Sequence, residues 1–117
     1  MSSGSYLQII QGDSYTFTAN VCVDNVAQNI TGSAVYFFGV GDVWPDFDSE
    51  TIINVSTNTG GVSINNSNVT VTLNAAYTNA LPLTNVGKWF LRTRTTGNNV
   101  YTLDRGNFCV VAGLPQI

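Results

Sequence analysis

Histidine is absent from this chain of 117 residues, and charged residues make up only 9% of it, against about 25% in an average soluble protein. Histidine is the commonest general acid or base and the commonest metal ligand. The remaining titratable side chains are few, with seven Asp or Glu and four Lys or Arg. We therefore expect a protein that is not an enzyme and that carries no cofactor.

Positive charge is also scarce, and the formal net charge is −3. A nucleic-acid-binding protein needs a basic surface to neutralise phosphates, so we expect no nucleic-acid partner. No apolar run approaches the roughly 18 residues of a membrane-spanning helix. The first residues, Met1 to Ser5, lack the basic and apolar segments of a signal peptide. We expect a protein that is made in the cytoplasm, is not secreted and binds no membrane.

Cysteine occurs only twice, at Cys22 and Cys109, which is too few for a disulfide scaffold. The alternation of polar and apolar residues places both side chains on the outward faces of their strands. We expect two reduced thiols that react with a thiol reagent in the native protein, and an intramolecular disulfide is the alternative.

Neutral polar residues are abundant, with Asn, Thr and Ser making up 37 of the 117 residues. Polar and apolar residues alternate along much of the chain, most clearly over residues 14–23, which is typical of strands with one buried face. Residues 74–81 form the one candidate helical turn, and Arg105-Gly106 is a candidate β-bulge. Further strands are expected over residues 6–10, 34–38, 51–56, 62–64, 68–73, 88–95 and 100–112.

Seven or eight short strands in a chain of this length predict a single all-β domain over residues 1–117. The spacing of the strands favours an immunoglobulin-like β-sandwich of antiparallel strands. A jelly-roll is the alternative.

Residues 39–50 show no periodicity and are predicted to form a long loop that carries four acidic residues. Trp44 and Phe47 lie among these acids, and they either cover the end of the sandwich or present an anchor to a partner. The spacing of Asp46, Asp48 and Glu50 resembles a set of calcium ligands. It lacks the glycine and the twelve-residue length of an EF-hand loop, so we predict a solvated loop and no metal site.

The strand over residues 88–95 is the most informative segment. Trp89, Leu91 and Thr93 alternate onto one face, which we predict to be buried. The opposite, outward face carries Lys88, Phe90, Arg92 and Arg94. This face holds three of the four positive charges beside an aromatic ring. We predict that it binds a partner, together with Trp44 and Phe47, and a merely solvated face is the alternative.

Several segments, in order and spacing, resemble a small immunoglobulin-like domain that is common in tailed bacteriophages. The similar segments are Ile9 to Val23 with its Gln-Gly-Asp, Asn29-Ile30-Thr31-Gly32-Ser33-Ala34-Val35, Gly60-Gly61-Val62-Ser63-Ile64, Val69 to Leu73, Gly87-Lys88-Trp89-Phe90-Leu91 and Leu103-Asp104-Arg105-Gly106-Asn107-Phe108. The resemblance covers roughly residues 7–111. It includes the N-terminal domain of baseplate upper proteins and free-standing virion proteins, and it does not include the loop at 39–50.

This resemblance implies a bacteriophage virion structural protein without catalytic residues. The chain ends at Ile117, without the long region that follows the domain in baseplate proteins. We therefore expect a capsid cement or decoration protein that is located in the virion and forms a homo-oligomer. The expected partner is the major capsid protein. The alternative is a baseplate, tail or collar component that binds a tail or baseplate protein.

A carbohydrate-binding module is the alternative from another functional class. Such a module would use Trp44 and tyrosine rings as stacking platforms. A platform needs two or three coplanar, exposed rings on one face, and the sequence alone places only Phe90 on such a face.

Overall fold

The computed structural model describes residues 6–41, 51–95 and 97–113. Within these ranges the chain is all-β, as predicted, with one helix of five residues, α1 (Ala75–Asn79). The strands are β1 (Leu7–Ile10), β2 (Tyr15–Asn20), β3 (Cys22–Val23), β4 (Val26–Ala27), β5 (Ala34–Val40), β6 (Thr51–Ser56), β7 (Val62–Asn65), β8 (Asn68–Leu73), β9 (Thr84–Arg94) and β10 (Val100–Val111).

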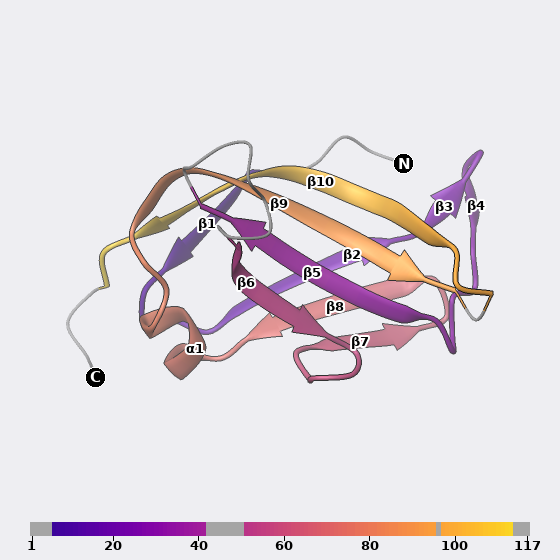
Figure 1. Cartoon of the computed structure of the whole chain (residues 1–117), viewed down its shortest axis with the longest axis horizontal. Coiled ribbons are helices and arrows are strands. Elements are labelled where there is room, and N and C mark those ends of the chain that lie inside the picture. The colour runs from indigo at the N-terminus through magenta and orange to yellow at the C-terminus, as the bar shows by residue number, and fades with distance from the viewer. Residues whose placement is uncertain (1–5, 42–50, 96, 114–117) are drawn as a thin grey trace.

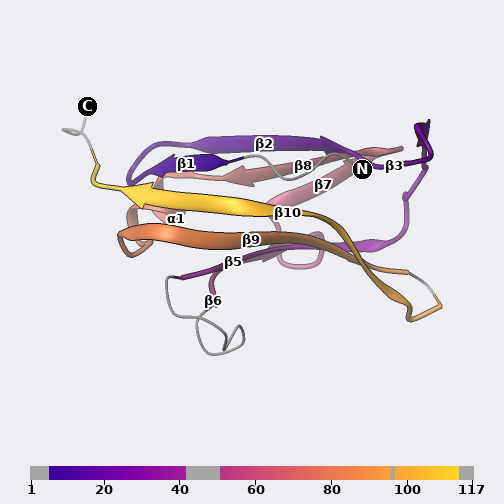
Figure 2. The ribbon, with the colours of Figure 1, turned by 90° about the horizontal axis from the view of Figure 1, so that it is seen from above.

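The strands form two main sheets that pack as a sandwich (Figure 1). The larger sheet has the order β1-β10-β9-β5-β6 and the smaller has the order β2-β8-β7. Figure 2 shows β2, β8 and β7 in one layer and β9, β5 and β6 in the other. This order corresponds to the G-F-C-C′ and B-E-D sheets of an immunoglobulin-like domain. It confirms the sandwich, and β1 adds a parallel pairing with β10 at one edge.

The core lies between the two sheets and is built around aromatic rings. Phe17 of β2 contacts both Trp89 of β9 and Phe37 of β5. Trp89 is completely buried. Leu91 and Thr93 are buried on the same side of β9, which confirms the inward face that the alternation predicts.

Helix α1 is hydrogen-bonded to the turn between β1 and β2. The buried Thr78 hydroxyl donates a hydrogen bond to the carbonyl of Asp13 and accepts one from the amide of Gly12. The Asn74 side chain caps the helix by accepting a hydrogen bond from the Tyr77 amide. The Tyr77 hydroxyl accepts a hydrogen bond from the Asn54 amide on the edge strand β6. These contacts close one end of the sandwich.

The boundaries of two predicted segments differ in ways that change the strand arrangement. The strand expected over residues 14–23 divides at Val21 into β2 and β3. The strand β3 then pairs with β4 through a turn whose Asp24 and Asn25 both have positive φ, as a two-residue hairpin turn of type I′ requires. Gly39 and Val40, which were predicted to begin the loop over 39–50, instead continue β5 and pair with β6 and β9.

The predicted bulge at Arg105-Gly106 was wrong. Both residues pair in regular register with Phe90 and Trp89 of β9. The register shifts instead between Thr102 and Asp104 and again between Phe108 and Val110. The first shift inserts Leu103, whose side chain is buried. The bulge therefore adds one core residue and resets the alternation of β10.

Candidate basic and aromatic binding face

The predicted partner-binding residues of β9 do share one outward face. Lys88 and Phe90 are partly exposed, and Arg92 and Arg94 are exposed. Cross-strand partners on a sheet point to the same side. The register therefore shows which residues of β5 and β10 join this face. Phe90 pairs with Phe38, and Arg92 pairs with Tyr36.

The fourth positive charge of the chain joins the other three. Arg105 of β10 pairs with Phe90 and is exposed. Next to it, Asn107 pairs with Lys88, and the Lys88 ammonium donates a 2.7 Å hydrogen bond to the Asn107 side-chain oxygen. We call this surface the basic face and define it by seven residues. They are Lys88, Phe90, Arg92 and Arg94 of β9, Tyr36 and Phe38 of β5, and Arg105 of β10.

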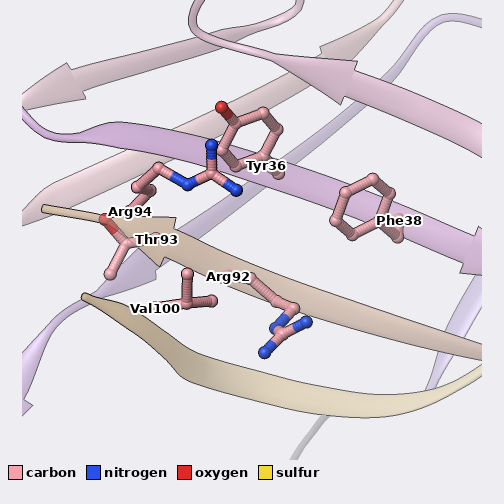
Figure 3. A pocket seen from close by; sticks show the side chains of 6 residues that line it. All are labelled: Tyr36, Phe38, Arg92, Thr93, Arg94 and Val100. Carbon is pink, nitrogen blue, oxygen red and sulfur yellow. The ribbon is translucent and has the colours of Figure 1, made fainter. Parts of the chain in front are cut away.

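A hollow of about 360 Å³ lies at one end of the basic face. Figure 3 shows the Arg94 guanidinium extending toward the Tyr36 ring, whereas Arg92 extends toward β10. The rings of Tyr36 and Phe38 are nearly parallel, with a 4° angle between their planes and 5.9 Å between their centroids. The hollow is lined by Tyr36, Phe38, Arg92, Thr93, Arg94 and Val100.

The backbone around the hollow is held in register by a buried side chain. The Thr93 hydroxyl donates a 2.9 Å hydrogen bond to the Ala34 carbonyl on the neighbouring strand β5. Because Thr93 lies between Arg92 and Arg94 in the chain, this bond holds the backbone that carries both arginines in place beside β5. The hollow can therefore offer two guanidinium groups beside an apolar surface, a combination suited to a carboxylate next to an aromatic ring.

Acidic groups lie away from the basic face in the part of the chain that the structure describes. Asp13 and Asp24 occupy turns, and Asp104 pairs with the inward Leu91. The Asp104 carboxylate accepts a hydrogen bond from the Arg105 amide. The other four acids belong to residues 42–50. Trp44 and Phe47, the remaining predicted partner-binding residues, lie outside the described residues, as do the calcium candidates Asp46, Asp48 and Glu50.

Four residues of the basic face and its hollow were not predicted as site residues from the sequence: Tyr36, Phe38, Val100 and Arg105. The inward positions of Val35 and Phe37 would have placed Tyr36 and Phe38 on an outward face. The alternation of one strand does not reveal which strand lies beside it, so their position next to Arg92 and Phe90 could not be predicted. The outward position of Arg105 was missed because the bulge at Leu103 interrupts the alternation of polar and apolar residues along β10.

The prediction that Cys109 is exposed was wrong. Cys109 is a free thiol on the side of β10 opposite to Phe108 and Val110, but only 7% of its surface is exposed. Interaction with its thiol, chiefly through hydrogen bonding, raises the pKa of the Tyr6 hydroxyl. Cys22 is also a free thiol and is partly exposed. The outward face of a strand is therefore not always accessible, because a neighbouring segment can cover it.

Across residues 6–41, 51–95 and 97–113, no group of three potential metal-ligating side chains gathers. Within the same ranges, no helix has the length and apolar character needed to cross a membrane.

No protein-family model and no curated protein sequence matches this chain.

Proposed function

We propose that this chain is a non-enzymatic structural protein of a bacteriophage virion, which attaches to the assembled particle through the basic face. The observation that carries the proposal is the charge distribution. All four positive charges gather around Tyr36, Phe38 and Phe90 on one side of a five-stranded sheet. Surface charges that are scattered contribute little to binding, whereas arginine and aromatic residues that cluster are typical of interface hot spots.

The resemblance to bacteriophage domains supports the virion setting. Its segments fall on successive parts of the sandwich. The Gln11-Gly12-Asp13 segment forms the turn after β1, residues 87–91 lie in β9 and residues 103–108 lie in β10. The segments thus follow the order of an immunoglobulin-like domain, the fold that the resemblance implies. Within this class we favour a capsid cement or decoration protein that binds the major capsid protein.

The scarcity of catalytic groups supports a structural role over an enzymatic one. The described residues with clearly displaced pKa values are Tyr6 and Tyr15, and neither belongs to the basic face. Displaced pKa values tend to gather at catalytic sites. The basic face contains arginine, lysine and aromatic side chains, which suit recognition of an acidic surface.

Carbohydrate binding is a second candidate, and one observation favours it. The rings of Tyr36 and Phe38 lie on one face and are nearly parallel, which is a necessary condition for a coplanar stacking platform. A glycan array that gives a reproducible hit, lost in the Tyr36→Ala variant, would establish this function. An array without a hit, together with binding to particles, would exclude it.

The attachment proposal is tested with virions from the genome that encodes the chain, prepared without this protein. Purified protein should bind these particles, and the Phe90→Ala/Arg92→Ala variant should lose about 2 kcal/mol of binding free energy, or roughly thirtyfold in Kd. Thr16→Glu, which changes an exposed residue of β2 on the other sheet, is the matched control and should bind normally.

Cryo-electron microscopy of the decorated particles then locates the protein. Density on the head would support the cement or decoration role, whereas density on the tail or baseplate would replace it with the alternative location. Wild-type protein that binds no part of the particle would refute the virion proposal. Unchanged binding of Phe90→Ala/Arg92→Ala would show that the basic face is not the attachment surface.

A further inference from the structure

The hollow on the basic face has a specific chemistry that narrows the choice of partner. Its volume of about 360 Å³ lies in the range of sites that hold a small ligand or a large side chain. Arg92 and Arg94 border it on β9, and Val100 borders it on β10. Tyr36 and Phe38 provide its aromatic surface. The best occupant is a segment that carries carboxylates next to an aromatic ring.

The chain itself contains a segment with this composition. Residues 42–50 read Asp-Val-Trp-Pro-Asp-Phe-Asp-Ser-Glu and hold four of the seven acidic residues. They also contain Trp44 and Phe47. We call these residues the acidic segment. Its negative charges and the four positive charges of the basic face are complementary, and both belong to every copy of the protein.

In the sequence, the acidic segment comes after one end of β5, whereas the hollow lies toward the other end of this strand. The acidic segment follows the end of β5, where Val40 pairs with Lys88. The hollow lies toward the other end of β5, where Ala34 pairs with Arg94. The seven residues of β5 span about 20 Å at about 3.4 Å per residue. This separation favours a head-to-tail contact, in which one copy offers its acidic segment to the hollow of the next.

Charge also argues against a symmetric contact through this face. If two copies met basic face to basic face, four positive charges would oppose four positive charges, and like charges across an interface are destabilising. A head-to-tail contact avoids this repulsion. Repeated head-to-tail contacts produce a closed ring or an open filament.

We propose that the hollow bounded by Tyr36, Phe38, Arg92, Arg94 and Val100 binds the acidic segment, residues 42–50, of a second copy. This inference rests on the proposed assembly role of the basic face, and it adds a neighbouring copy as the partner of the hollow at one end of that face. Arginine–carboxylate pairs in the hollow give the contact its register, and the aromatic side chains of the acidic segment pack against Tyr36 and Phe38. The contact weakens at high salt because its ion pairs are screened.

The test measures self-association of the purified full-length protein by analytical ultracentrifugation, without virions. Wild-type protein should associate with increasing concentration, and more weakly at high salt. Arg92→Glu/Arg94→Glu should weaken self-association more than about tenfold, because it removes charge-assisted hydrogen bonds and adds repulsion. Asp46→Lys/Asp48→Lys should weaken it equally. Thr16→Glu is the matched control and should associate like the wild type.

Mixing the two charge-reversed variants gives the decisive result. The reversed hollow of the first variant complements the reversed acidic segment of the second, so the mixture should associate although each variant alone does not. Circular dichroism checks that both variants are folded. A mixture that remains monomeric would overturn the proposal, as would a wild-type protein that remains monomeric or an Arg92→Glu/Arg94→Glu variant that associates normally.

The outcomes of this experiment and of the particle-binding experiment are separable. Self-association without particle binding would retain the head-to-tail contact and refute the virion role. Particle binding by a protein that never self-associates would retain the virion role and refute the contact.

Discussion

Phe17 of β2 and Trp89 of β9 contact each other between the two sheets, with 5.1 Å between their ring centroids and 65° between their planes. The strands β2 and β9 occupy the positions of strands B and F, which a disulfide joins in antibody domains. In this chain, edge-to-face packing of two rings links these strands. Cys22 and Cys109 lie on other strands and are both free.

Trp89→Ala should lower the free energy of unfolding by about 3–5 kcal/mol, because it removes a large, completely buried side chain and leaves a cavity. Urea denaturation followed by circular dichroism measures this change. Arg92→Ala, three residues further along the same strand and exposed, is the control and should change it by no more than about 0.5 kcal/mol. Equal effects of the two substitutions would contradict the assignment of Trp89 to the inward face of β9 and of Arg92 to its outward face.

Gly87→Ala should destabilise the fold by about 1–3 kcal/mol through overpacking. A Cβ atom at this position would lie 2.3 Å from the Phe108 ring. Gly97→Ala is the control, since the nearest atom would lie 3.7 Å away, and it should cost much less. In a Phe108→Leu background, Gly87→Ala should lower the free energy of unfolding by less, because the ring that the new Cβ atom contacts is absent and the two positions are therefore coupled. An unchanged cost in that background would rule out the clash with the ring.

Cys22 should react rapidly with a thiol reagent in the native protein, whereas Cys109 should react only when the protein unfolds. Cys22 is partly exposed, whereas Cys109 is 7% exposed, and access limits the rate of thiol reactions. Absorbance after addition of Ellman's reagent counts the rapid thiols. The Cys22→Ser variant should show almost no rapid reaction, and two rapid thiols in the wild type would contradict the burial of Cys109.

Stability should fall with increasing pH above about 10, partly through Tyr15. Burial raises the pKa of Tyr15 above its ordinary value of 10.0, so the folded state retains the proton at pH values where the unfolded state has lost it. The free energy of unfolding therefore decreases as pH rises through this range. Tyr15→Phe should reduce this slope, as measured by urea denaturation between pH 8 and about 11. An identical slope in both proteins would contradict the raised pKa.

Local patterns in the sequence predicted most of the strands. Alternating residues identified both faces of β9, because a strand directs successive side chains to opposite sides. The Asp24-Asn25 turn and the end of the helix before Pro82 were also predictable, since both depend on local backbone preferences. The same reasoning predicted one outward surface on this strand, formed by Lys88, Phe90, Arg92 and Arg94.

The tertiary structure determines which strands are neighbours in the sheet. This strand order brings the residues of the candidate site together. Tyr36 and Arg92 are 56 residues apart in the sequence but pair across β5 and β9. Alternation specifies the face of each strand, whereas strand order and register depend on how the whole core packs. Packing also places Leu103 in the core through a β-bulge in β10. It buries Cys109 as well, although this residue lies on the outward side of the strand. The sequence by itself therefore determined the residues that point outward, and the packing of the two sheets determined which of them meet.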